Sequence, residues 1–299
     1  MSAPPPHTGY AFTGPNHLHN DIYPSINPTS TPSLHQRGKV VLITGAGRGI
    51  GRAIALQYAH AYVGTLILCA RTCSELDAVS SQIAHINPRI TVNKHTLDVS
   101  NSDAVTHLAH TVRATHARLD VLINNAGHSS PWLPITNSDP DDWWRTWEVN
   151  LKAPFQLIHA FLPLLTATAA AHKHVVHVLN ISSLGAHVLI PGASAYQTSK
   201  LALLRLGEFV HAEYGDKGVN VVGVNPGGVL TRLSEREEIL RPYLIDTPEL
   251  CGGFVVWLTA EPRMWLGGRY VSATWDVDVL EGMKEDIVNE DKLVVRMVV

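Results

Sequence analysis

A tyrosine and a lysine four residues apart are the most chemically suggestive pair in this chain. Tyr196 and Lys200 are the first and last residues of a YQTSK run. On a helix, side chains four residues apart stand on one face, one turn from each other. An ammonium group beside a phenol favours the phenolate and lowers a pKa that is about 10 in isolation. Many isolated pairs of this kind are surface contacts, but here the pair is suited to proton transfer near neutral pH.

A glycine-rich turn, TGAGRGIG at 44–51, directly follows the apolar run 39–43 and opens a helical stretch. Glycine permits a tight turn and lets a pyrophosphate approach without a Cβ in its way. The helix that follows presents free N–H groups and the positive end of its dipole to that anion. The turn predicts a dinucleotide site, with contacts from Gly45, Gly49, Ile50 and Gly51.

The end of the second expected strand indicates which dinucleotide is bound. An acidic residue about 20 positions past the glycines holds the ribose 2′-hydroxyl of NAD, but here Ala70 stands in its place and Arg71 follows. Alanine does not repel a 2′-phosphate and arginine pairs with one. Arg48, inside the turn, reaches towards the same phosphate. We therefore predict NADP(H) over NAD(H); the alternative is that Arg71 is only a solvated charge at the next helix.

The spacing TGxxxGxG, rather than GxGxxG, resembles the turn of the short-chain dehydrogenase/reductase family. Further motifs similar to those of the family follow in its order across residues 39–231. The resemblance is to the NADP-preferring ketoreductase type. The motifs are Asp98, NNAG at 124–127, Asn150 in EVNL, Ser183 in NISS, the YxxxK pair and PGxxxT at 226–231.

The resemblance implies a catalytic role for four residues. Ser183 lies 13 residues before Tyr196 and would polarise the substrate carbonyl, although its neighbour Ser182 is easily confused with it. Tyr196 would donate the proton to the carbonyl oxygen, and Lys200 would bind the nicotinamide ribose. Asn150 would hold a water that links Lys200 to solvent; read alone, it is a polar residue at a helix kink.

The same resemblance implies the remaining cofactor contacts. Asp98 would accept a hydrogen bond from the adenine amino group, or else cap the helix beginning near Asn101. The backbone of Val229 would hold the carboxamide, and Thr231 would contact it or a phosphate. The contacts expected beyond the glycine turn are Arg71, Asp98, Val99, Asn125, Ala126, Gly127, Tyr196, Lys200, Pro226, Gly227, Val229 and Thr231.

Apolar strand-like runs alternate with amphipathic helical stretches from residue 38 onward. This alternation predicts βαβ units with a parallel sheet and right-handed crossovers. The fold class is therefore α/β, a single doubly wound Rossmann domain over 38–299 with about seven strands and helices on both faces. After 39–43 we expect strands at 66–70, 90–97, 121–124, 175–181, 219–224 and about 267–271, and helices at 50–60, 74–86, 101–117, 140–168 and 194–215.

Composition excludes several classes of function. The net charge of −3 implies no polyanion-binding surface, so we expect no nucleic acid partner. No run reaches the roughly 20 apolar residues that span a bilayer, so no membrane partner is expected either. Three cysteines make no disulfide framework. Because the N-terminus also lacks the apolar segment of a secretory signal, we expect a cytoplasmic protein.

Two segments lie outside the motifs. Residues 1–37 are rich in proline, serine, threonine and asparagine with little periodicity, which predicts a flexible extension; the alternative is an arm that wraps a partner subunit. Residues 232–265 are expected to form a substrate lid, mobile at 232–246, and a following helix. The tail after Trp275 has no interpretable pattern.

The tryptophans and histidines leave further alternatives open. Trp132, Trp143, Trp144 and Trp147 follow the fourth strand, and such a cluster is usually core or subunit interface; the sharper alternative is that Trp132 lines a pocket for a bulky small-molecule substrate. Long apolar helix faces at 140–168 and 194–215, with the resemblance, predict a homodimer or homotetramer. Seventeen histidines lack accompanying carboxylate or thiolate clusters, so no metal site is expected.

The motifs predict NADP(H)-dependent hydride transfer between a carbonyl and an alcohol. The same geometry would serve an imine reductase, an epimerase or a cyclase. A regulator that binds the dinucleotide without chemistry usually lacks the tyrosine or the lysine, and both are present here.

Overall fold

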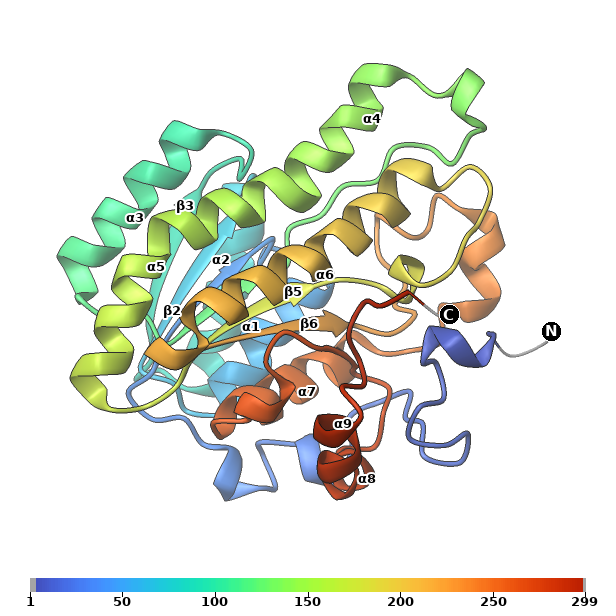
Figure 1. Cartoon of the computed structure of the whole chain (residues 1–299). Helices are drawn as coiled ribbons and strands as arrows, with labels where there is room; N and C mark the ends of the chain where they lie inside the picture. The colour runs from blue at the N-terminus through green and yellow to red at the C-terminus, as the bar shows by residue number, and fades with distance from the viewer. Residues whose placement is uncertain (1–3, 298–299) are drawn as a thin grey trace.

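Seven parallel strands form one sheet in the order β3-β2-β1-β4-β5-β6-β7 in the computed structural model, which describes residues 4–297 (Figure 1). The strand order reverses between β1 and β4, and ligands of doubly wound sheets bind at such a switch point. The predicted doubly wound α/β fold is thus confirmed. The strands are β1 (Val40–Thr44), β2 (Thr65–Ala70), β3 (Thr91–Thr96), β4 (Val121–Asn124), β5 (Val176–Ile181), β6 (Val219–Asn225) and β7 (Tyr270–Ser272).

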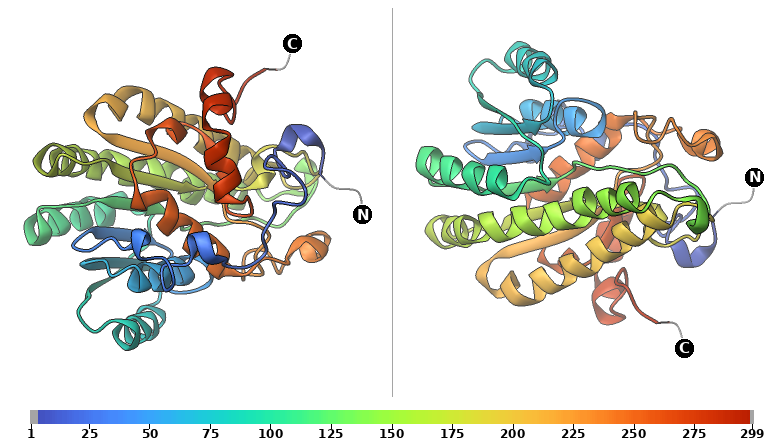
Figure 2. Two further views of the ribbon diagram at one scale, coloured as in Figure 1. Left: turned by 90° about the horizontal axis from the view of Figure 1, so that it is seen from below. Right: turned by 90° about the horizontal axis from the view of Figure 1, so that it is seen from above.

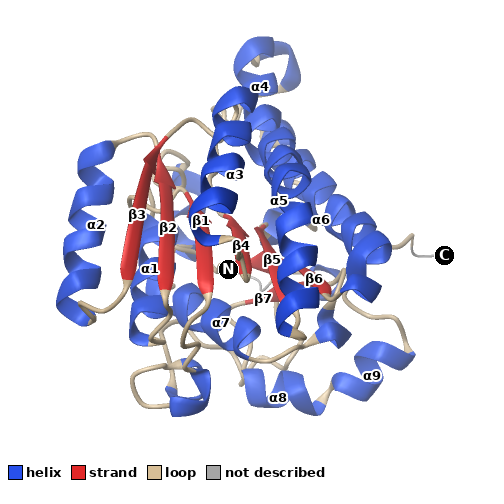
Figure 3. Ribbon diagram, turned by 90° about the vertical axis from the view of Figure 1, so that its left-hand side faces the viewer, coloured by secondary structure: helices blue, strands red, loops and turns tan. Residues whose placement is uncertain are grey.

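Helices cover both faces of the sheet (Figure 3). One face packs against α1 (Gly49–His60), α2 (Cys73–Ile86) and α7 (Pro248–Ala260); the other packs against α3 (Ser102–His116), α5 (Ala153–His172) and α6 (Ser194–Tyr214). On that second face α5 and α6 run side by side (Figure 2). Because the strands are parallel, their carboxyl ends all lie at one edge of the sheet, between the two helix layers.

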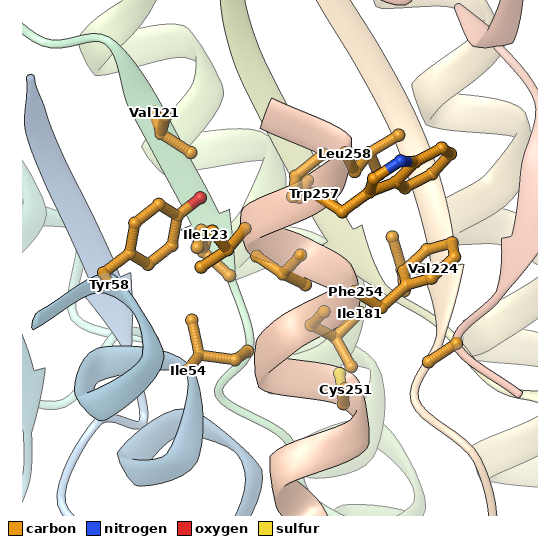
Figure 4. Packing of buried hydrophobic residues seen from close by; sticks show 14 of the residues in the cluster. Ile54, Tyr58, Val121, Ile123, Ile181, Val224, Cys251, Phe254, Trp257 and Leu258 are labelled. Carbon is orange, nitrogen blue, oxygen red and sulfur yellow. The ribbon is translucent and has the colours of Figure 1, made fainter. Parts of the chain in front are cut away.

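A hydrophobic core between the sheet and helices α1 and α7 holds the carboxyl edge of the sheet in place. Ile54 on α1, Cys251 and Phe254 on α7, and Ile181 and Val224 of the sheet belong to one buried cluster (Figure 4). Burying an aliphatic or aromatic side chain of this size contributes about 1.5–3 kcal/mol. The helix expected after the lid is therefore part of the core, so the lid itself ends before α7.

The helix predicted at 140–168 is longer and interrupted. It consists of α4 (Pro140–Trp147), a π-helical turn (Glu148–Lys152) and α5. Within the described chain, the run 140–172 is the one helix long and apolar enough to cross a membrane, and half of its apolar window is buried in this fold. The π-turn places Asn150 where the helix axis bends, a geometry that frequently marks functional sites.

The N-terminal extension, which its composition predicts to be flexible, has anchors in the core. Its described part, residues 4–37, lies against the domain in three 3₁₀ turns, Pro6–Thr8, Pro24–Ile26 and Pro32–Leu34. Each turn begins at a proline, whose fixed φ suits the first position of a helical turn. The side chains of Ile26 and Leu34 are buried in the α1–α7 core. The intervening polar residues concealed these anchors in the sequence.

The C-terminal tail also returns to the domain. After β7 the chain forms α8 (Val277–Gly282) and α9 (Lys284–Asn289). Trp275, Leu280 and Ile287 are fully buried. This tail holds the N-terminal extension in place, because Leu18 pairs with Trp275 in an antiparallel bridge.

Candidate active site

The glycine turn between β1 and α1 has the shape of a phosphate cradle. A Cβ on Gly51 would lie 2.3 Å from the Gly45 oxygen, so only glycine fits. The amide of Asn125 donates to the backbone oxygens of Thr44 and Gly45 at 2.8 and 3.3 Å. The Thr44 hydroxyl accepts from the N–H groups of Asn125 and Ala126. The NNAG motif therefore locks the turn, and the free N–H groups at the start of α1 suit a pyrophosphate.

The structure places the two predicted 2′-phosphate ligands differently. Arg71 is exposed after β2, and within the described residues its side chain has no hydrogen-bonding or ionic partner. The Arg48 guanidinium is paired with Glu75 at 2.9 Å, and Arg232 of the lid approaches the same carboxylate at 3.6 Å. Arg48 can thus reach a phosphate only in competition with Glu75, a contact that the sequence did not reveal.

Asp98 does not cap the helix that follows it. The N-cap of α3 is Asn101, whose side chain accepts from the Ala104 N–H at 3.0 Å. Asp98 instead accepts from Ser100 and pairs with Arg145 at 2.6 Å. These hydrogen bonds and the Arg145 charge hold the pKa of Asp98 below its usual value although partial burial opposes them. Asp98 lines the cavity beside Val99, as an adenine-binding carboxylate would.

Tyr196 and Lys200 lie one turn apart on α6, as predicted. The Lys200 Nζ is 5.7 Å from the centre of the Tyr196 ring and donates to the Ile181 oxygen at 2.7 Å. Lys200 is 5% exposed, and burial lowers its pKa to about 8. The expected lowering of the Tyr196 pKa is wrong for this structure: burial raises it, opposed by a hydrogen bond with Ser183. The ammonium is directed at Ile181 rather than at the phenol oxygen.

The two neighbouring serines separate clearly. The Ser182 hydroxyl is buried and donates to the Lys200 backbone oxygen at 3.2 Å, so it supports α6. The Ser183 hydroxyl accepts from the Gly185 N–H at 2.9 Å and lies beside Tyr196 at the cavity. Of the two, Ser183 has the position that polarising a carbonyl requires.

Asn150 is fully buried in the π-turn between α4 and α5. Its side-chain oxygen accepts from the backbone N–H of His128 at 2.9 Å. Its side-chain amide donates to the backbone oxygen of His128 at 2.8 Å and to the Ser199 hydroxyl at 3.0 Å. The side chain thus joins the helix to the segment after β4 and to α6. Both interpretations of Asn150 remain compatible, because a kink residue in this place also lies next to the Lys200 turn.

The PGxxxT loop after β6 closes over the glycine turn. Thr231 lies next to Gly49, whose Cβ would sit 3.4 Å from the threonine methyl group. Gly227 has φ +90°, and the Gly228 N–H donates to Asp246 at 2.6 Å. The sequence analysis missed Asp246, because an acidic residue in a divergent lid carries no recognisable signal. It fastens the end of the lid to the cofactor loop.

Apart from the buried Asn150, each of these motifs contributes residues to the lining of one cavity of about 1400 Å³. Small-molecule sites usually measure roughly 300–1,000 Å³, so this cavity has room for a dinucleotide and a substrate together. Around Ser183 and Tyr196 its walls are largely apolar. Trp132 stands in this wall, which is the sharper of its two predicted roles. The apolar lining residues here are Trp132, Leu184, Val188, Ile190, Ile239, Leu240, Tyr243 and Ile245.

The other predicted features lie apart from this cavity. On α4, Trp143 and Trp147 stack, and Trp144 contacts both rings edge-on. Trp144 is 60% exposed and flanks an open apolar groove with Phe155 and Leu206. Within residues 4–297, no three histidine, cysteine, aspartate or glutamate side chains gather as a metal site.

A Rossmann sheet with a glycine cradle, a half-buried Tyr196 and a buried Lys200 defines a dinucleotide-binding oxidoreductase. The family model for short chain dehydrogenases matches residues 39–239. The chain belongs to the short chain dehydrogenase family, whose members bind a nicotinamide cofactor, and it is an oxidoreductase enzyme.

Similar proteins cover nearly the whole chain. Short chain dehydrogenase mpl6 of Monascus purpureus is 44% identical over 98% of this chain and 99% of its own length. Short chain dehydrogenase andI of Emericella variicolor is 37% identical over 93% and 94%. Among solved structures, a metagenomic short-chain oxidoreductase in complex with NADP is 32% identical, with a TM-score of 0.66, covering 80% of this chain and 97% of its own.

Proposed function

We propose that this enzyme is an NADP(H)-dependent reductase that converts a carbonyl to an alcohol. The observation that carries the proposal is the pair of Tyr196 and Lys200, with Ser183 beside the phenol, in a cavity that the phosphate cradle also lines. A nicotinamide bound at the PGxxxT loop would supply the hydride.

The residues of the chain supply the remaining chemistry. Ser183 and Tyr196 hydrogen-bond the carbonyl oxygen and polarise it, and Tyr196 donates its proton to the developing alkoxide. Because burial raises its pKa, Tyr196 stays protonated at neutral pH and acts as an acid. Lys200 would hold the ribose, and Asn150, which donates to the hydroxyl of Ser199 next to Lys200, would hold the water that brings the replacement proton from solvent.

NADP(H) preference is part of the proposal. Alanine at position 70 leaves room where NAD-binding proteins carry an acid, and the exposed guanidinium of Arg71 is free to pair with a 2′-phosphate. The similar metagenomic oxidoreductase is described in complex with NADP. The pairing of Arg48 with Glu75 makes Arg71 the principal determinant.

Location and assembly complete the proposal. The free cysteines Cys69, Cys73 and Cys251 suit the reducing cytoplasm. The exposed groove of Trp144, Phe155 and Leu206 suits a subunit interface of a homodimer or homotetramer.

Titration of NADPH and NADH by fluorescence tests cofactor choice, and a panel of ketones, quinones and polyol-type alcohols tests the reaction. Tyr196→Phe should abolish turnover and retain NADPH binding. Full activity of that variant would contradict the proton-donor assignment, and absence of any NADPH binding would contradict the whole proposal.

A further inference from the structure

The cavity has a wall that lies outside the matched family region. The family model begins at residue 39, yet Pro4, Pro5 and Tyr10 line the cavity. They flank the first 3₁₀ turn, Pro6–Thr8, which stands at the carboxyl edge of the sheet near the lid (Figures 1 and 2).

This wall stands on the substrate side. His7 is near enough to His187, in the segment after Ser183, to lower the pKa of that histidine further than its burial does. On the other side, Asp246 at the end of the lid adds to the raised pKa that burial gives Tyr10. The segment therefore spans the opening between the Ser183 turn and the lid.

A buried tryptophan fixes the backbone at Tyr10. Trp275 is fully buried, and its indole N–H is shared between the backbone oxygens of Gly9 and Tyr10 at 3.2 and 3.1 Å. Phe12 packs against the same indole, with ring centres 5.2 Å apart. The backbone of Gly9 and Tyr10 is therefore fixed beside the cavity, as the backbone of a loosely attached arm would not be.

Contacts of His19 and Asn20 tie the segment to the cofactor end. His19 donates its N–H to the Thr274 oxygen and contacts Asp276, each at 2.8 Å. The Asn20 amide donates to Asp246 at 2.5 Å, and the other oxygen of that carboxylate accepts from Gly228. The extension, the lid and the cofactor loop thus share one carboxylate.

We propose that residues 4–20 form a wall of the substrate site and that Tyr10 packs against the substrate, selecting bulky, largely apolar carbonyl compounds. The same cavity is also lined by Trp132, Val188 and Ile190, and such apolar and aromatic side chains suit a ring-containing molecule. This inference rests on the proposed function, because it assigns the carbonyl substrate to the same site.

Menadione, a bicyclic aromatic quinone, is the probe for this wall. Calorimetric titration into the full-length NADP⁺ complex measures its binding without turnover, because the oxidised cofactor carries no hydride. Loss of an aromatic contact in Tyr10→Ala should weaken binding roughly tenfold. Tyr10→Phe keeps the ring and should bind within about twofold of the wild type, since the net contribution of one hydroxyl is small.

Two further variants make the result specific. Tyr10→Trp enlarges the side chain and should also weaken menadione binding. Tyr62→Ala is the matched control, because Tyr62 is exposed outside the cavity against Arg37 and His35; its binding should equal the wild type. Unchanged binding in both Tyr10→Ala and Tyr10→Trp, equal weakening in Tyr62→Ala, or no binding to the wild type would each overturn the proposal.

Turnover with NADPH separates this inference from the proposed function. If menadione binds in a Tyr10-dependent way but neither it nor the other carbonyl compounds of the panel are reduced, the inference about Tyr10 is supported and the proposed reaction is contradicted. If menadione is reduced but Tyr10→Ala has unchanged affinity and kinetics, the proposed reaction is supported and the inference about Tyr10 is contradicted.

Discussion

Asn225, at the end of β6, accepts a hydrogen bond at 3.0 Å from the N–H of Leu184, the residue that directly follows Ser183. Its amide donates to the Ser272 hydroxyl on β7 at 2.9 Å. The buried side chain thus fixes the turn carrying Ser183 relative to two strands. We therefore predict that Asn225 is a positioning residue that acts through Ser183.

Replacing this amide should separate catalysis from binding. Asn225→Ala leaves the Leu184 N–H without its partner and should lower the free energy of unfolding by about 1–3 kcal/mol. Because the Ser183 hydroxyl shifts, kcat should fall roughly 10- to 100-fold. The KM for NADPH should change little. Steady-state kinetics and urea unfolding measure the two effects.

The same strand offers a matched control. Asn220 is also buried on β6, and its amide donates to the Arg263 oxygen at 3.1 Å, away from the cavity. Asn220→Ala should lose comparable stability while keeping kcat. An equal fall of kcat in both variants would show that Asn225 has only a structural role.

The lowered pKa of Lys200 predicts a pH dependence. With a pKa of about 8, Lys200 is charged below that pH and neutral above it. The raised pKa of Tyr196 keeps the phenol protonated over the same range. The kcat/KM for reduction should therefore decline as pH rises through about 8. The neutral amine stabilises negative charge on the phenol oxygen less than the ammonium does, and it binds the ribose hydroxyls less well.

A charge-retaining variant tests the assignment. The guanidinium of Lys200→Arg cannot be deprotonated in this range, so the decline near pH 8 should vanish even if activity is lower. A wild-type profile that is flat from pH 6 to 10 would contradict the role of Lys200. Stability measured across the same range excludes unfolding as the cause.

The features of the site that the sequence predicts are those set by a short local pattern. The glycine turn, the NNAG end of β4 and the helical spacing of Tyr196 and Lys200 are set within a few residues, so their spacing predicts them. The seven-stranded sheet followed from alternating apolar runs and is confirmed. The catalytic and cofactor roles of these residues stay predictions.

Long-range contacts could not be predicted. Glu75 reaches Arg48 across 27 residues, and Trp275 binds Tyr10 across 265. Nothing in the local sequence of the extension marks Ile26 as a core residue. Low periodicity there reflects a chain folded by anchors in other segments rather than an absence of structure.

The pairing of Glu75 with Arg48 predicts an unusual gain of function. Glu75→Gln removes a carboxylate that competes with a 2′-phosphate, so NADPH affinity should rise while NADH affinity stays unchanged. Arg71→Ala should weaken NADPH binding roughly tenfold, the equivalent of about 1.4 kcal/mol. Fluorescence titrations at low and high salt measure both, and screening should reduce each effect.

Glu281→Gln is the control for this charge effect, because Glu281 pairs with Arg263 at 2.6 Å outside the cavity. It should leave both cofactor affinities unchanged. Equal shifts for NADH and NADPH in Glu75→Gln would contradict a contact with the 2′-phosphate.

The shared indole N–H of Trp275 should determine how firmly the extension is attached. Trp275→Phe keeps a ring but removes the donor to Gly9 and Tyr10. A local loss of about 1.4 kcal/mol would raise the open population of residues 4–20 tenfold, and limited proteolysis should cleave this segment correspondingly faster. Trp257→Phe is the matched control, since Trp257 is buried on α7 outside the cavity lining. Equal cleavage of residues 4–20 in the two variants would mean that global stability, not the indole hydrogen bonds, holds the extension against the substrate site.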